Sequence, residues 1–87
     1  MKIIAKPIEM VVWYDEVGIP HPVRFRIKAE DDSNVVVKIE KVIEREVEKL
    51  AGNKMIVFIC QSTINGVLKL YEIKYELSTC KWTLFKI

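Results

Sequence analysis

The stretch from Lys54 to Leu77, KMIVFICQSTINGVLKLYEIKYEL, predicts a β-hairpin. Two runs rich in β-branched and aromatic residues flank Asn65-Gly66, the strongest short-range signal for a two-residue hairpin turn. Both turn residues tolerate φ > 0, as a type I′ turn requires. A turn at this point makes four cross-strand pairs whose eight side chains share one face: Ile64 with Val67, Cys60 with Tyr71, Phe58 with Ile73, and Ile56 with Tyr75.

A second hairpin is predicted over residues 8–28. Ile8 to Tyr14 is rich in apolar residues and is followed by a polar turn. Residues 19–22 are held extended, because the two prolines there fix their own φ and bias the residues before them. Val23 to Lys28 then alternates between apolar and basic side chains, which is typical of a strand that is buried on one face.

Residues 35–50 are compatible with a strand or with an amphipathic helix. Seven of residues 35–47 are valine or isoleucine, which favour sheets, and like charges repeat at i,i+4 spacing, which disfavours a helix. Strand alternation also fits, because it separates an apolar face from a charged one. The apolar face holds Val35, Val37, Ile39, Ile43 and Val47, and the charged face holds Lys38, Glu40, Glu44, Glu46 and Glu48. We therefore expect extended structure here.

Two more turns extend the central hairpin into a meander over residues 35–87. A turn at Gly52-Asn53 would set Val47 opposite Phe58, on the apolar face already defined. A return through Ser78-Thr79 would place Trp82 and Leu84 on that same face, with Phe85 and Ile87 behind it. The expected fold is all-β, an antiparallel meander of about five to seven strands curled into a small barrel or roll. The alternative is an α+β fold with a helix at residues 38–51.

The composition predicts one globular domain over residues 1–87, with 51% hydrophobic and 30% charged residues. No apolar run approaches the ~20 residues of a membrane span. The N-terminus lacks the apolar segment and cleavage site of a signal peptide. We therefore expect a cytoplasmic protein without membrane contact, in which Cys60 and Cys80 stay reduced.

Residues with catalytic or metal-binding potential are few and scattered. His21 is the only histidine and lies between two prolines. No Cys/His cluster has metal-site spacing, and the three isolated glycines form no phosphate-binding loop. Cys60 falls on an apolar strand face, and Cys80 lies in a turn without a partner base in view. We expect no catalytic residues, no metal and no cofactor, so the chain is not expected to be an enzyme.

A basic row is expected on the exposed face of the second strand, formed by Arg24, Arg26 and Lys28. Small barrels often bind single-stranded nucleic acid by combining basic side chains with stacking aromatics. Two aromatic residues, Trp13 and Tyr14, would lie near this row if residues 8–14 pair with 22–28. A net charge of only +2 and the acidic row on residues 44–48 dilute the positive field. Nucleic-acid binding is therefore the alternative function.

The second face of the central hairpin is also apolar. It brings together side chains from three strands, namely Ile59, Leu68, Leu70, Phe85 and Ile87. An exposed patch of this kind usually marks a partner surface, and a two-fold homodimer is the commonest way to bury one. We expect an interface here with a second copy or with an unknown protein partner. A closed barrel, or the N-terminal strands packed on this face, would bury the patch instead.

Several strings of the sequence carry a resemblance: KLAGNK at 49–54, CQS at 60–62, YEIKYEL at 71–77 and TCKW at 79–82. With them, most of the chain resembles a family of small uncharacterised proteins of Gram-positive anaerobic bacteria. That family has no assigned activity, so the resemblance implies a complete single domain and names no mechanism. The leading expectation is a non-catalytic β-domain that acts as a protein-interaction module, with a homodimer as one form.

Overall fold

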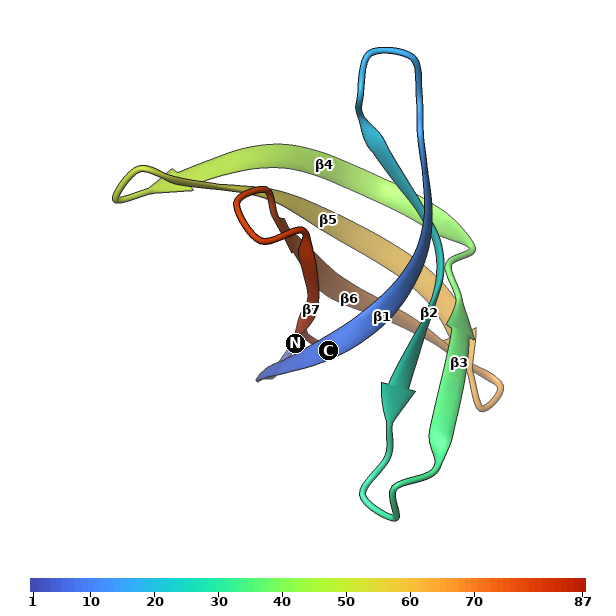
Figure 1. Cartoon of the computed structure of the whole chain (residues 1–87). Coiled ribbons are helices and arrows are strands. Elements are labelled where there is room, and N and C mark those ends of the chain that lie inside the picture. Colours follow the sequence, from blue (N-terminus) through green and yellow to red (C-terminus); the bar gives the residue numbers. More distant parts are fainter.

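Seven β-strands form one antiparallel sheet in the computed structural model, which describes residues 1–87 (Figure 1). The strands are β1 (Ile3–Tyr14), β2 (Pro20–Lys28), β3 (Asn34–Lys38), β4 (Lys41–Leu50), β5 (Asn53–Ile64), β6 (Val67–Glu76) and β7 (Lys81–Lys86). Their order across the sheet is β3-β2-β1-β7-β6-β5-β4. The all-β meander is therefore confirmed, and residues 38–51 form no helix. Nothing in the chain meets the requirements of a membrane-spanning helix.

The central hairpin pairs as the sequence predicts. Asn65 and Gly66 have φ of 51° and 75°, as a type I′ turn requires. Ile64 pairs with Val67 next to the turn, and the same register continues along both strands. It includes the other three predicted pairs, which are Cys60 with Tyr71, Phe58 with Ile73, and Ile56 with Tyr75. Local turn chemistry therefore fixes the longest pairing in the sheet.

The turn between β4 and β5 lies at Ala51-Gly52 and not at Gly52-Asn53 as predicted. Val47 consequently pairs with Ile56, and Arg45 takes the position opposite Phe58. The reason is not local: Asn53 begins β5, and its side-chain amide donates to Glu76 Oε2 at 2.8 Å. This contact with β6 favours the observed register, in which Ala51 adopts φ of 50°. The two-residue shift leaves the apolar face of the strand unchanged, because side chains alternate with a period of two.

A four-residue loop, residues 77–80, leads from β6 into β7. It sets Tyr75 opposite Trp82 and Ile73 opposite Leu84, so both β7 residues share the predicted apolar face. Phe85 lies behind the sheet as predicted, where the ammonium of Lys74 sits 3.9 Å from its ring centroid. Ile87 does not lie there; it packs against the buried cluster. A bulge in the β6–β7 ladder and two backbone hydrogen bonds between Ile87 and Lys2 turn the C-terminus inward.

The N-terminal hairpin continues the same sheet. The first half of β1, up to Ile8, pairs with β7, and the second half, from Glu9 to Tyr14, pairs with β2. Bulges interrupt the β1–β2, β1–β7, β4–β5 and β6–β7 ladders, and bulges increase local bend and twist. The sheet therefore curls into a half-barrel, with the two chain ends side by side (Figure 1).

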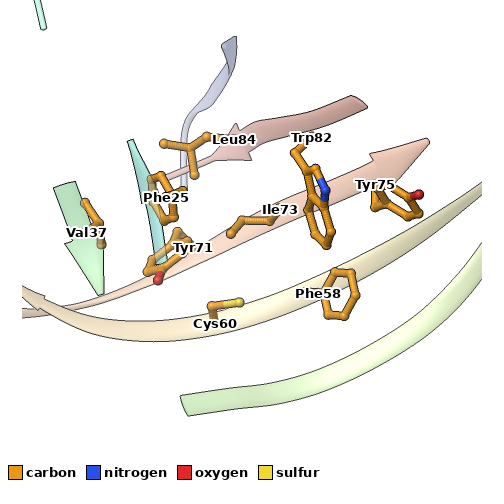
Figure 2. Close-up of a cluster of buried hydrophobic side chains, with 9 residues drawn as sticks. All are labelled: Phe25, Val37, Phe58, Cys60, Tyr71, Ile73, Tyr75, Trp82 and Leu84. Carbon is orange, nitrogen blue, oxygen red and sulfur yellow. The ribbon is translucent and has the colours of Figure 1, made fainter. Parts of the chain in front are cut away.

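The core fills the concave side of the half-barrel. Its buried members come from β2, β3, β5, β6 and β7: Phe25, Val37, Phe58, Cys60, Tyr71, Ile73, Tyr75, Trp82 and Leu84 (Figure 2). The Phe25 ring meets Tyr71 edge-on with centroids 5.7 Å apart, which places the N-terminal hairpin over the predicted core face. The Trp82 ring packs against those of Tyr75 and Phe58, with centroids 4.6 and 5.6 Å apart. The apolar face that the sequence predicts for β5, β6 and β7 is therefore the buried one.

Residues 35–50 do not form one continuous strand. The chain leaves β3 at Lys38, bends through residues 39–40 and enters β4 at the opposite edge of the sheet. Backbone hydrogen bonds hold the bend on both sides: Ile39 N–H donates to Val23 O, and Glu40 N–H donates to Gln61 O, each at 3.0 Å. The prediction of extended structure is confirmed, but the break was missed because its causes lie on other strands.

Candidate functional site

The half-barrel stays open between the first residues of β2 and strand β4. β2 pairs with β3 from Arg24 onward, and β3 ends at Lys38, so residues 20–23 have β1 as their only neighbouring strand. Pro20 and Pro22 lie in this part of β2. A proline is tolerated in a strand where its missing N–H would face the edge. The β2 edge therefore offers no N–H donors at these two positions, and β4 cannot complete a ladder against it.

β4 is consequently a free edge strand. It pairs with β5 on one side only, and nine of its ten residues are exposed. Leu50 and Asn53 flank the two-residue turn, so these two residues exchange backbone hydrogen bonds. Along an antiparallel ladder, hydrogen-bonded pairs alternate with pairs whose N–H and C=O groups point away from the partner strand. The backbone N–H and C=O groups of Arg45, Val47 and Lys49 therefore point to the open edge. Val47 is 66% exposed.

A hollow of about 230 Å³ lies beside this edge. The β1–β2 hairpin contributes one side of it, and β4 with β5 the other; its lining is Trp13, Pro20, His21, Pro22, Val42, Arg45 and Phe58. The rings of Trp13 and His21 stack with centroids 4.0 Å apart. The exposed guanidinium of Arg45 makes no ion pair in the structure. The hollow is therefore mainly apolar and aromatic, with one cation at its border.

The outer face of β4 carries an acidic row, formed by Glu44, Glu46 and Glu48. These residues pair with Ile59, Val57 and Met55 on the convex side of β5. The carboxylate of Glu48 lies 3.2 Å from Lys74 Nζ, and this is the only ion pair of the row. Val57 is buried although it lies on the convex side. Glu44 and Glu46 remain exposed without basic partners.

The predicted basic row lies on the outer face of β2, where Arg24, Arg26 and Lys28 are all exposed. The structure adds exposed Lys38, which pairs with Arg24 across β2 and β3. Trp13 shares this face, because it lies two residues beyond Val11, the β1 partner of Arg24. One member is neutralised, since Arg26 Nη2 donates to Glu9 Oε2 at 2.7 Å. The structure thus brings three unpaired cations and the Trp13–His21 stack onto one face.

His21 is engaged in holding the β1–β2 turn. Its Nε2–H donates to Asp15 Oδ2 at 2.9 Å, and Asp15 Oδ1 accepts from the backbone N–H groups of Val17 and Ile19. The bond from His21 and these two N–H groups lower the pKa of the Asp15 carboxyl below its ordinary value. The carboxylate is therefore the organising group of this turn. No nucleophile accompanies the pair within the hollow beside it.

Both cysteines are free thiols, and they lie in different environments. Cys60 is fully buried, and this burial raises the pKa of its thiol to about 12. Cys80 is exposed in the β6–β7 loop and lines an open hollow of about 560 Å³ that contains no histidine. No group of three or more histidine, cysteine, aspartate or glutamate side chains is arranged to hold a metal ion.

The predicted interface residues are only partly brought together. Leu68 and Leu70 are exposed on the convex side of β6, and Ile59 and Phe85 beside them are half-buried. Ile87 leaves the group because it packs against the core. We call the four remaining residues, Ile59, Leu68, Leu70 and Phe85, the convex patch.

Sequence reasoning missed the free edge and the hollow beside it. The signal that could have found them is the Pro20-His21-Pro22 string within an otherwise regular strand, because prolines mark an unpaired edge. The class that the fold defines is an antiparallel half-barrel with one long strand that is paired on one side only. No protein-family model, no curated protein and no solved structure matches this chain.

Proposed function

We propose that this protein is a non-catalytic interaction module that binds an extended segment of another protein along β4. The single observation that carries the proposal is the free edge of β4, a ten-residue strand that pairs on one side only and is exposed almost throughout. Peptides often bind by adding a strand to such an edge, where backbone hydrogen bonds supply affinity. A cytosolic location is consistent with two free thiols, one of them exposed.

Long exposed edges are a liability, because they also template aggregation. Proteins usually blunt them with prolines, inward-pointing charges or short strands. Here the prolines stand on the facing edge of β2. β4 carries charges, with Arg45 on its inner face and three glutamates on its outer face, but it keeps its outward N–H groups at Arg45, Val47 and Lys49. β4 thus keeps its hydrogen-bonding groups at the gap, whereas the facing edge of β2 lacks N–H donors at its two prolines. This difference supports a binding role for the β4 edge.

Val47→Pro tests the proposal directly, because it removes one outward N–H without touching the β4–β5 ladder. The matched control is Val47→Thr, which keeps the N–H and changes the side chain to a β-branched polar one. A library of random peptides displayed on phage is selected on the wild-type protein. We expect enriched peptides whose binding is lost with Val47→Pro and retained with Val47→Thr, with both variants folded by circular dichroism. Enrichment of no peptide, or binding that survives Val47→Pro, would contradict the proposal.

Nucleic-acid binding is a second candidate, favoured by one specific arrangement. Lys38 joins Arg24 and Lys28 on the outer face, and the Trp13–His21 stack lies on the same side of the β1–β2 hairpin. Cations that follow a strand, together with an exposed aromatic surface, suit the backbone and bases of a single strand. Trp13 is 55% exposed, so one face of its ring system is accessible to a base.

Salt dependence tests this second candidate. Replacing Arg24, Arg26 and Lys28 with serine should reduce the slope of log K against log salt by about two for a single-stranded oligonucleotide. The reason is that binding with fewer phosphate contacts releases fewer counterions. The control replaces three exposed lysines elsewhere, Lys49, Lys54 and Lys69, and leaves the slope nearly unchanged. Absence of binding to single-stranded DNA or RNA at low salt would retire this candidate.

A further inference from the structure

The charge pattern of β4 determines which kind of strand can pair with it. The outer face presents Glu44 and Glu46 without basic partners, followed by Glu48, whose carboxylate is shared with Lys74. Residues directly opposite each other on neighbouring strands lie close enough for opposite charges to attract and like charges to repel. An added strand therefore meets three carboxylates along one face, at alternate positions.

A second copy of this chain is a poor occupant of the β4 edge. A two-fold axis perpendicular to the sheet keeps the outer face of each β4 on the outside. The acidic row of one copy then lies against the acidic row of the other in the registers that align the two strands over most of their length. Like charges placed opposite one another destabilise the pair, and inward- or outward-pointing charges on edges are a common device against self-pairing.

The inner face of the same edge has different chemistry. Val42, Arg45 and Phe58 border the hollow from this face, and Trp13 and His21 border it from across the gap, on the outer face of the β1–β2 hairpin. Side chains of an added strand alternate between the two faces, so every second one points toward this hollow. A large apolar or aromatic side chain fits walls of this kind and can also stack on the Arg45 guanidinium.

We propose that the β4 edge binds an extended segment of another protein in which lysine or arginine alternates with apolar residues. The basic side chains face Glu44, Glu46 and Glu48, and one apolar side chain enters the hollow beside Arg45. The inference rests on the proposed function and adds the chemical class of the partner. It follows from charge complementarity on the outer face and from the hollow on the inner face, which are separate observations.

Two defined peptides of about nine residues test the outer face, one that alternates lysine with valine and one that alternates glutamate with valine. We expect the lysine peptide to bind the wild-type protein at least about tenfold more tightly, measured by fluorescence anisotropy at low salt. Glu44→Gln combined with Glu46→Gln should remove most of this preference. The matched control, Glu30→Gln combined with Asp32→Asn, changes the net charge equally in the β2–β3 loop, away from β4, and should leave the preference intact.

A third peptide tests the inner face, with phenylalanine in place of the central valine of the lysine peptide. It should bind more tightly than its parent, and Trp13→Ala should abolish that gain without removing the preference for lysine. Val47→Pro separates a test of the β4 edge from a test of the partner's chemistry. Binding that survives Val47→Pro overturns the proposed edge itself. Binding that is lost with Val47→Pro but shows no preference for lysine overturns only the partner chemistry. A dimer of the protein that Val47→Pro dissociates would show that the occupant is a second copy.

Discussion

The hydroxyl oxygens of Ser62 and Tyr71 lie 2.5 Å apart in the core, and Ser62 also donates to the carbonyl of Lys38 at 2.7 Å. Both side chains are fully buried. Because Ser62 gives its proton to Lys38, Tyr71 is the donor of the bond between the two hydroxyls. Lys38 is the last residue of β3, so this pair connects the middle of the sheet to the bend from which β4 starts. No buried side-chain polar atom lacks a partner.

Ser62→Ala should therefore destabilise the protein by about 1–3 kcal/mol, because it leaves the Lys38 carbonyl and the Tyr71 hydroxyl without a partner in the core. Urea unfolding followed by tryptophan fluorescence measures the change. Thr63→Ala is the control. The Thr63 hydroxyl donates to the exposed carboxylate of Glu40 at 3.2 Å, and its removal should lower the free energy of unfolding much less. Equal losses for the two variants would mean that the buried contact is not specific.

Ala51→Asn should stabilise the protein, because Ala51 holds φ of 50°, where asparagine is better tolerated than alanine. The change reproduces at the β4–β5 turn the Asn-Gly pair that the β5–β6 turn already has. The gain should be about 0.5–1 kcal/mol in the free energy of unfolding. Asn65→Ala is the reciprocal variant and should lose a similar amount. A destabilised Ala51→Asn would show that the methyl group of Ala51 makes a contact of its own.

The parts of the fold that local chemistry decides were predictable from the sequence. The Asn65-Gly66 turn needs only its own two residues, and the alternation of β5 and β6 then assigns the core face. The exposure of Arg24, Arg26 and Lys28 follows from the same alternation on β2. Each of these features depends on residues that are adjacent in the chain.

The features that were missed depend on residues far apart in the chain. The observed β4–β5 turn brings Asn53 into a hydrogen bond with Glu76 of β6, and the inward-turned Ile87 pairs with Lys2 at the other end of the chain. The free edge of β4 faces two prolines on β2, which are far from it in the chain. The alternation of apolar and polar residues predicts which face of a strand is buried, but it does not predict which strand lies beside it. The Pro20-His21-Pro22 string marks an unpaired edge in the sequence, but it does not identify β4 as the strand across the gap.

The β1–β2 turn should weaken in acid. The pKa of the Asp15 carboxyl is lowered from 3.8 by the hydrogen bonds from His21, Ile19 and Val17. A lowered folded-state pKa means that the ionised carboxylate stabilises the folded state above the unfolded value, and that this contribution disappears as the pH falls through the folded value. The difference in melting temperature between wild type and Asp15→Asn should therefore shrink below about pH 4. An Asp15 carboxyl that titrates at or above 3.8 by NMR would contradict this assignment.

The two thiols should react very differently with iodoacetamide. Cys60 has no exposed surface, and burial raises the pKa of its thiol to about 12, so little thiolate is available. Cys80 is exposed in its loop. Mass spectrometry of the native protein at neutral pH should find one adduct, on Cys80, and the unfolded protein should show two. With Cys80→Ser, the native protein should remain unlabelled; rapid labelling of Cys60 in that variant would mean that β5 opens readily.

The convex patch carries the prediction of a homodimer. Phe85 lies at its edge under the ammonium of Lys74, 3.9 Å from the ring centroid, and Leu70 is 49% exposed. Phe85→Glu should leave the domain folded, because the new carboxylate can pair with Lys74 and Lys86, which already approach the ring. Ile87→Glu is the contrasting variant and should destabilise the protein, since Ile87 packs against the core.

In sedimentation equilibrium we expect the wild type to self-associate at high concentration and Phe85→Glu to remain a monomer. Val47→Pro should not change this equilibrium, because the convex patch and the β4 edge are separate surfaces. A wild-type protein that sediments as a monomer at every concentration would end the homodimer prediction and leave the β4 edge as the one proposed interaction surface.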